Sequence, residues 1–286
     1  MKIHPYSVRL SEGTQPLVQV LDHIRAENIS MRLRTVGPEL KAEDILTRNG
    51  LYYMDFVRMR FRGGPGRASR TAQIQGFQFQ RDEAFGEETA ALYDPGTGFI
   101  FVQYKHEGIK AAHIAQYLSN YIPTAQNNYE FHACLDPDVL AKLRRKRIFR
   151  KIDFTVASGP VTHRERQQGV SMKRALVHIG ESGAQSISVS VSMAHEHTGM
   201  DRSWVNETLN LLRSNISGDQ GSVSTLRVYA KDDPTTPTEI LDLIANRLYK
   251  DYELEPSAVD LRYPRDARYH LLETARTELA PHLRHD

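Results

Sequence analysis

The sequence predicts an α+β fold, with a mixed or mainly antiparallel sheet or sheets and flanking helices. Three observations support this class. The predicted strands outnumber those of a simple doubly wound sheet, one connection between strands is a hairpin, and helices are interspersed among the strands. The strand-helix-strand units also permit two ferredoxin-like αβ units, an expectation that rests on fold analogy alone.

A chain of 286 residues is long enough for one large domain or two modest ones. The polar, turn-rich segment at residues 158–169 indicates a boundary. It would separate an N-terminal αβ unit, residues 1–157, from a C-terminal αβ unit, residues 158–286. A single domain that spans both is the alternative.

The first part of the chain is predicted to contain two helices, a strand and a hairpin. Residues 15–26 have an apolar face at helical spacing, and Thr14 can cap that helix. Residues 53–62 alternate as a strand does. In residues 88–104 a turn-forming sequence separates two apolar runs, which predicts a hairpin, and residues 109–121 follow as a helix.

The middle of the chain is predicted to contain three strands and one helix. The strands are residues 129–134, 152–157 and 186–193, and the last of these alternates apolar residues with serines. The helix begins at Asp136 as its N-cap, with Pro137 in the first helical position.

The last part of the chain is predicted to contain three helices and two strands. Residues 202–213 and 267–279 have helical spacing, and residues 226–230 and 259–263 read as short strands. The sequence Thr-Pro-Thr-Glu at residues 236–239 has the form of a capping box and predicts a helix after it.

Composition restricts the class of protein. Hydrophobic residues make up 40% and charged residues 25% of the chain, which excludes wholesale disorder. The single cysteine, Cys134, excludes a disulfide scaffold and is expected to be a packed core thiol. No apolar run approaches the roughly 18 residues of a membrane span, and the first residues lack the apolar core of a signal peptide. We therefore expect a cytoplasmic protein with no membrane partner.

The charges are unevenly distributed along the chain, although the net charge is only +2. Seven of the ten residues from 142 to 151 are basic and none is acidic. One or two cations there would complement the dipole of a helix C-terminus, and seven exceed that need. We expect contacts to phosphates or to an acidic protein; a merely solvated surface is the alternative. The side chains of this basic run are Lys142, Arg144, Arg145, Lys146, Arg147, Arg150 and Lys151.

A second basic surface is predicted on the strand at residues 53–62. Alternation places three arginines about 7 Å apart on one face, similar to the spacing of successive phosphates on a single strand. The glycine-rich loop that follows is not a Walker P-loop, because no GxxxxGK[ST] is present. The alternative is an edge strand protected by charge, or arginines paired with the acids of residues 82–88. The side chains are Arg58, Arg60, Arg62, Arg67 and Arg70.

Carboxylates near a lysine offer a catalytic alternative, a metal-dependent nuclease. Gln103 stands two residues before Lys105, where the E-x-K ending of restriction-type nucleases has an acid. That departure argues against catalysis, and we expect the protein not to be an enzyme. The candidate side chains are Glu83, Glu87, Glu88, Asp94 and Lys105.

Two smaller features suggest ligand contacts. His195 and His197 would share one face of an extended chain and bind a metal, but no second Cys or His cluster with zinc spacing accompanies them. A surface turn is the preferred interpretation. The serines of residues 186–192 are predicted to form a solvated sheet face, with contacts to phosphates as the alternative. We expect no metal and no cofactor.

Two segments resemble a family of uncharacterised bacterial proteins. They are residues 82–118, DEAFGEETAALYDPGTGFIFVQYKHEGIKAAHIAQYL, and residues 226–248, LRVYAKDDPTTPTEILDLIANRL, about a fifth of the chain. Members of that family are encoded near prophages, mobile elements and antiviral defence genes. The resemblance implies a setting in anti-phage defence or mobile-element biology, with nucleic acid or a phage component as partner. It implies no catalytic residues.

Together these observations predict a nucleic-acid-binding component of a bacterial anti-phage defence or mobile-element system. Both basic surfaces would contact phosphates, and the nucleic acid would be DNA or RNA, single- or double-stranded. A metal-dependent nuclease is one alternative. An oligomerising interaction subunit that docks onto an effector protein is another, and we expect a homo-oligomer.

Overall fold

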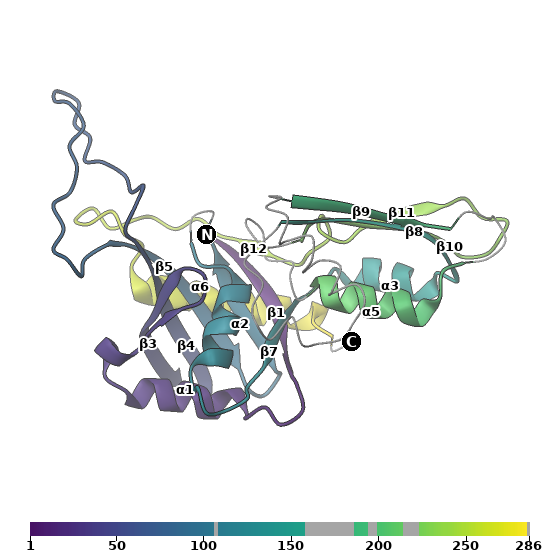
Figure 1. The fold of residues 1–286 in the computed structure, drawn as a ribbon, viewed down its shortest axis with the longest axis horizontal. Helices are drawn as coiled ribbons and strands as arrows, with labels where there is room; N and C mark the ends of the chain where they lie inside the picture. The colour runs from purple at the N-terminus through teal and green to yellow at the C-terminus, as the bar shows by residue number, and fades with distance from the viewer. Residues whose placement is uncertain (106–107, 158–185, 194–198, 214–222, 285–286) are drawn as a thin grey trace. The chain divides into compact units, whose positions relative to one another are not determined.

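The computed structural model describes residues 1–286 except 106–107, 158–185, 194–198, 214–222 and 285–286 (Figure 1). The described residues form two antiparallel sheets, of eight and four strands, with α-helices packed against them. The predicted α+β class is therefore confirmed. The five α-helices of the described residues are α1 (Leu17–Ala26), α2 (Ala111–Asn120), α3 (Pro137–Arg145), α5 (Arg202–Arg213) and α6 (Arg265–Leu279).

The chain divides into two compact units, and the chain crosses between them more than once. The first unit comprises residues 1–2, 10–129 and 252–273, and the second comprises residues 3–9, 130–251 and 274–286. The boundary predicted near residue 158 adjoins residues 158–185, which lie outside the described residues.

The larger sheet has the strand order β12-β1-β6-β5-β4-β3-β2, and β7 pairs with β1. Its strands are β1 (Lys2–Leu10), β2 (Leu33–Thr35), β3 (Glu39–Arg48), β4 (Leu51–Arg60), β5 (Phe85–Asp94), β6 (Phe99–Tyr104), β7 (Tyr129–Ala133) and β12 (Lys250–Asp251). Of these, β1 and β3 are long strands that the sequence patterns did not reveal.

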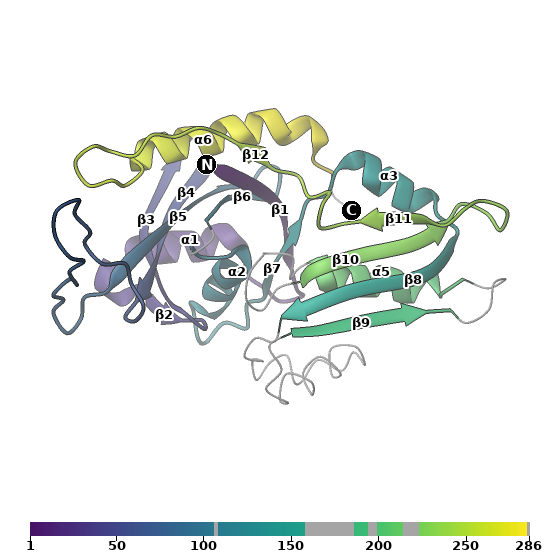
Figure 2. The ribbon, with the colours of Figure 1, turned by 90° about the horizontal axis from the view of Figure 1, so that it is seen from above.

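Helices cover both faces of the first unit's strands (Figure 2). On one face Tyr53 of β4 packs against Tyr269 of α6, with 5.3 Å between ring centroids. On the other, Phe56 packs edge-on against Tyr117 of α2 at 5.6 Å. Because neither face meets water, successive residues in the middle of β4 and β5 are buried, instead of every second residue.

Tight turns join neighbouring strands of this sheet. The predicted hairpin at residues 88–104 is confirmed, since β5 and β6 pair antiparallel and Asp94 Oδ1 accepts hydrogen bonds from the backbone N–H of Gly96 and Thr97. Asn49 and Gly50, both with positive φ, make the turn between β3 and β4. Asn-Gly is a strong hairpin sequence because it tolerates that left-handed backbone.

The second unit contains the four-stranded sheet, in the order β11-β10-β8-β9. Its strands are β8 (Ile148–Ala157), β9 (Ser186–Ser192), β10 (Val223–Lys231) and β11 (Glu239–Asp242). Helices α3 and α5 lie against one face (Figure 1), and α5 buries Val205, Leu209 and Leu212 there. The serines of β9 are exposed, as predicted, so the opposite face of this strand is open to solvent.

Two predicted elements are wrong. Residues 239–242 form strand β11 and not a helix, because they pair with β10. The apparent capping box is a local turn, in which Asp233 Oδ1 accepts hydrogen bonds from the backbone N–H of Thr235 and Thr236. Residues 259–263 form a turn and not a strand; Leu261 has a φ of 58°, and Val259 is 95% exposed.

The remaining helices form where the sequence patterns predicted them, and one of the two predicted side-chain caps is present. Asp136 caps α3 by accepting a hydrogen bond from the backbone N–H of Asp138 at 2.8 Å. Thr14 does not cap α1; Gln15 instead donates its backbone N–H to Asn127 Oδ1 at 3.0 Å. Among the described residues, no helix is both long and apolar enough to cross a membrane.

Candidate functional site

Residues 61–84 connect β4 to β5 and extend away from the sheet (Figure 1). We call this segment the arm. Two backbone hydrogen bonds tie it together, from Arg67 N–H to the Gln75 carbonyl at 2.7 Å and from Gln75 N–H to the Arg67 carbonyl at 3.0 Å. Most side chains of the arm are exposed. Such a loop is long for a compact domain, and loops of this length are usually either functional or linker segments.

Phenylalanines form a partly exposed cluster at the base of the arm. The rings of Phe77 and Phe79 stack with centroids 6.1 Å apart, and both meet Phe85 edge-on, at 5.6 and 4.7 Å. Phe77 is 51% and Phe79 43% exposed. The ring of Phe85 lies so close to Gly64 that any Cβ atom there would collide with it. Phe85 thus anchors both rings, and both stay partly exposed to solvent.

Four arginines of the arm are exposed, and within the described residues none of them makes a salt bridge. They are Arg62, Arg67, Arg70 and Arg81. Together with the phenylalanines they give one segment both cationic and aromatic side chains. The alternation Phe-Gln-Phe-Gln-Arg at residues 77–81 was a sequence signal for this surface, and sequence reasoning that counted only basic residues missed it.

The predicted row of arginines on β4 is divided between the sheet and the arm. Strand β4 ends at Arg60, so Arg62 lies in the arm. Arg60 forms an ion pair with Glu87 at 3.1 Å, and Arg58 lies directly opposite Glu87 in the antiparallel register. Arg60 is therefore paired with an acid of the neighbouring strand. Pairing with the acids of residues 82–88 was the alternative to a phosphate-binding surface.

The three lysines of the basic run at residues 142–151 are matched by acids of their own unit. Lys146 is the most enclosed member, with a side chain 4% exposed, and its Nζ lies 2.5 Å from Glu239 and 3.2 Å from Asp232. Lys142 also pairs with Glu239, at 3.4 Å. The hydrogen bond from Lys146 lowers the pKa of Glu239 below its ordinary value. Lys151 pairs with Asp153 at 2.8 Å.

The arginines of the run have a different environment from its lysines. Arg144, Arg145 and Arg147 are exposed, and Arg150 is half-buried in β8. The end of α3 is capped from another element, because Arg202 donates to the carbonyls of Arg144 and Lys146, at 2.9 and 3.1 Å.

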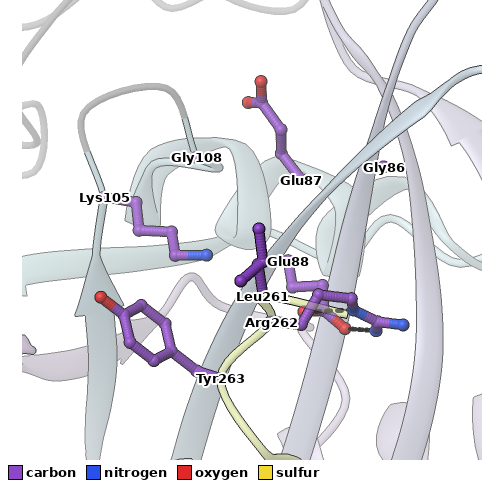
Figure 3. Close-up of a pocket in the computed structure, with 8 residues that line it drawn as sticks. All are labelled: Gly86, Glu87, Glu88, Lys105, Gly108, Leu261, Arg262 and Tyr263. Atoms are coloured by element: carbon purple, nitrogen blue, oxygen red, sulfur yellow. Dashed lines mark hydrogen bonds and ion pairs between the residues drawn. The ribbon is translucent and has the colours of Figure 1, made fainter. Parts of the chain in front are cut away.

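A pocket of about 250 Å³ lies in the first unit (Figure 3). The start of β5, the chain just after β6 and the segment before α6 contribute its walls. Figure 3 shows Lys105 and Tyr263 on one side and the paired side chains of Glu88 and Arg262 on the other, with the Glu87 carboxylate turned away. The lining residues are Gly86, Glu87, Glu88, Lys105, Gly108, Leu261, Arg262 and Tyr263.

A buried ion network lies beside the pocket. Asp55 on β4 is fully buried, and its two oxygens accept hydrogen bonds at 2.7 Å from the two terminal nitrogens of Arg268. Arg265 binds both Asp55, at 3.1 Å, and Asp44 on β3, at 3.0 Å.

The network reaches the pocket through Glu88. Arg268 lies 3.6 Å from Glu88, which Arg262 binds directly. Sequence reasoning missed this network, because the arginines and their acids are 174 to 221 residues apart along the chain.

Burial and charge shift the pKa of two pocket side chains. Burial alone would raise the pKa of Glu88, but hydrogen bonds from Arg262 and the charges of Arg268, Arg262 and Lys105 outweigh it, and the pKa is lowered. Burial lowers the pKa of Lys105, and the attraction of Glu88 does not fully oppose this effect. Groups with shifted pKa values in a pocket are candidates for function.

The structure does not gather the proposed nuclease carboxylates around a metal. Glu87 and Glu88 line the pocket with Lys105, and their carboxylates are bound by arginines. Asp94 stabilises the β5–β6 turn, and Glu83 accepts the backbone N–H of Gln80 in the arm. Across the described part of the chain, no group of three or more His, Cys, Asp or Glu side chains is placed to hold a metal ion.

The structure also places most of the other residues that the sequence analysis singled out. Gln103, in the position of the nuclease acid, is buried and accepts a hydrogen bond from the backbone N–H of Ala90 at 3.0 Å. Cys134 is buried, 7% exposed, as expected of a core thiol. Ser188 shares a hydrogen bond of 3.0 Å with Thr155 on the adjacent strand. His195 and His197 lie outside the described residues.

Comparison with known proteins gives a family and no function. No curated protein matches the chain. The sequence profile of a family of unknown function, DUF6731, matches residues 13–261, which include the whole arm and all pocket-lining residues up to Leu261. The chain therefore belongs to the DUF6731 family.

Proposed function

We propose that this protein binds single-stranded nucleic acid through the arm. The observation that carries the proposal is the combination, on one projecting segment, of a stacked and exposed phenylalanine pair with four exposed arginines. Proteins that bind single strands combine these two features, since aromatic rings stack on bases and cations contact the backbone.

Single strands suit this surface better than a duplex. The faces of Phe77 and Phe79 contribute binding energy only to bases that are unstacked and accessible, which a duplex does not offer. Arginines of the arm, such as Arg67 and Arg70, would contact phosphates without reading sequence. Binding would therefore be tolerant of sequence and strongly dependent on salt.

The basic run contributes less in this proposal. Its three lysines already have carboxylate partners, so a phosphate would have to displace an acid to reach them. The exposed Arg145 and Arg147 would add long-range attraction to the nucleic acid. We further propose that the protein works in the bacterial cytoplasm, within an anti-phage defence or mobile-element system.

The test is fluorescence anisotropy with labelled single-stranded DNA and RNA of about 20 nucleotides, and with the matching duplex, over a range of salt concentrations. The triple variant Arg62→Ala, Arg67→Ala, Arg70→Ala removes three charges from the arm. We expect it to bind single strands at least about tenfold more weakly, and to lower the slope of log K against log salt by about 0.7 for each lost contact.

The matched control removes three charges from the basic run, as Lys142→Ala, Arg145→Ala, Arg147→Ala. This variant should bind within about threefold of the wild type, since it leaves the arm intact. Failure of the wild-type protein to bind any single strand would overturn the proposal. So would a control variant that loses as much affinity as the arm variant, because that result would move the interface to the basic run.

A further inference from the structure

Among the described residues, four cations lie in the pocket of the first unit or in the ion network beside it. Three arginines, Arg262, Arg265 and Arg268, each bind a carboxylate of Glu88, Asp55 or Asp44. Lys105 is the fourth cation. Among the described residues, no carboxylate lies within salt-bridge distance of its Nζ. The nearby Glu87 is engaged by Arg60, and Figure 3 shows its carboxylate directed away from Lys105.

The Lys105 side chain points into the pocket (Figure 3). The Lys105 side chain is half-buried, and its Nζ lies 5.5 Å from the centre of the Tyr263 ring. On the neighbouring wall, a Cβ on Gly108 would approach Lys105 Cβ to 2.8 Å and Thr89 Oγ1 to 2.9 Å. Glycine at this position thus lets the backbone close tightly around the lysine. A half-buried ammonium that forms no salt bridge with the described residues is unfavourable, and an anion at its Nζ would relieve that cost.

We propose that this pocket binds a small ligand through an oxyanion group, a carboxylate or a phosphate, held against Lys105 Nζ with Tyr263 beside it. At about 250 Å³ the pocket is smaller than the roughly 300–1,000 Å³ of sites for drug-sized molecules, so the ligand is a small one. Arg262 and Arg268 are already engaged by Glu88 and Asp55, which leaves Lys105 as the primary contact. This inference is independent of nucleic-acid binding by the arm.

The direct test is isothermal titration calorimetry on the full chain, with inorganic phosphate and with succinate as the two probes. Lys105→Met removes the charge and keeps most of the side chain's volume, and it should weaken binding by about tenfold or more. Lys105→Arg keeps the charge and should retain most of the affinity. The matched control is Lys41→Met, since Lys41 lies in the same unit and already pairs with Glu43; it should bind as the wild type does.

A second measurement uses the wild-type protein and does not depend on whether a variant folds. Lysines are acetylated with a limiting amount of an activated ester, and the modified positions are mapped by mass spectrometry. An anion bound to Lys105 should slow the acetylation of Lys105 by about tenfold and leave the acetylation of Lys41 unchanged.

Protection by phosphate alone or by succinate alone identifies the preferred oxyanion. The proposal is overturned if neither anion binds, or if neither protects Lys105. The arm variant should bind these anions normally, which separates this outcome from that of the nucleic-acid experiment.

Discussion

The arginines of the arm and the arginines around the start of α6 belong to the same unit but have opposite environments. Arg268 is 1% exposed and shares two hydrogen bonds with the fully buried Asp55. Arg67 and Arg70 are exposed, and no salt bridge to them is found in the described residues. The difference teaches that an arginine contributes to folding where the fold supplies a carboxylate, and is available to a ligand where it does not.

The two environments also differ in what removal of a charge should do. A buried ion pair that loses one partner leaves an uncompensated charge in the protein interior. An exposed arginine that is removed leaves only solvent. Changes near α6 should therefore alter the free energy of unfolding, and changes in the arm should alter binding alone.

The largest expected effect is on Asp55. Asp55→Asn removes the negative charge that Arg268 and Arg265 share, and we expect it to lower the free energy of unfolding by about 3–5 kcal/mol. Urea denaturation monitored by circular dichroism measures this loss. Asp82→Asn, which removes an exposed carboxylate from the arm, is the control and should change stability by less than about 0.5 kcal/mol. A loss of under about 1 kcal/mol for Asp55→Asn would show that the network is not structural.

The next effect is on binding by the phenylalanines of the arm. The double variant Phe77→Ala, Phe79→Ala should weaken single-strand binding by about 1–3 kcal/mol for each base that loses its stacking partner. It should leave the salt dependence unchanged, because no charge is lost. Anisotropy at several salt concentrations separates this result from that of the arginine variant. If the double variant binds as tightly as the wild type, the rings are not a stacking surface.

An intermediate effect is expected for the basic run. Lys146→Met leaves Glu239 and Asp232 without their shared cation, and both acids are partly exposed, so water compensates for much of the loss. We expect the free energy of unfolding to fall by about 1–2 kcal/mol. Arg147→Gln, one residue further along and exposed, should leave stability unchanged. Equal losses for the two variants would contradict the contrast between paired and exposed cations.

The smallest expected effect is on how the free energy of unfolding depends on pH. The pKa of Glu88 is lower in the folded protein than in the unfolded chain, so the unfolded state binds more protons between the two pKa values. The stability from Glu88 is thus fully present above its unfolded pKa and is lost as the pH falls through the folded pKa. Glu88→Gln should therefore differ most from the wild type near about pH 6, above the ordinary pKa of a glutamate, and the difference should shrink as the pH falls below that ordinary pKa. A difference that stays constant with pH would exclude this origin.

The sequence predicted elements where local signals and packing agree. The turn at Asp94 and the cap at Asp136 were recognised because the side chain that forms each one is next to it in the chain. At residues 236–239 a local signal was overruled, because pairing with β10 stabilises a strand there more than a cap stabilises a helix. Strand β3 was missed although Asn49 and Gly50 mark its turn.

The residues of the candidate sites, like the elements, could be predicted from the sequence only where their environment is local. The exposed arginines of the arm could be read from the sequence, since nothing distant alters their environment. The pairing of Lys146 with Glu239 could not, because the partner is 93 positions away and lies in a segment with helix-like sequence. Arg262, Arg265 and Arg268 carried no local signal, and only the fold brings them to β3, β4 and β5.

The distance between Asp55 and Arg268 along the chain has a consequence for synthesis on the ribosome. Their hydrogen bonds join residues 213 positions apart. At about 5–20 residues per second, Asp55 is made roughly 10–40 s before Arg268. During that time β4 holds a carboxylate that the finished fold buries, with no cation to accompany it. The first unit therefore reaches its final stability only after nearly the entire chain, including most of the second unit, has been translated.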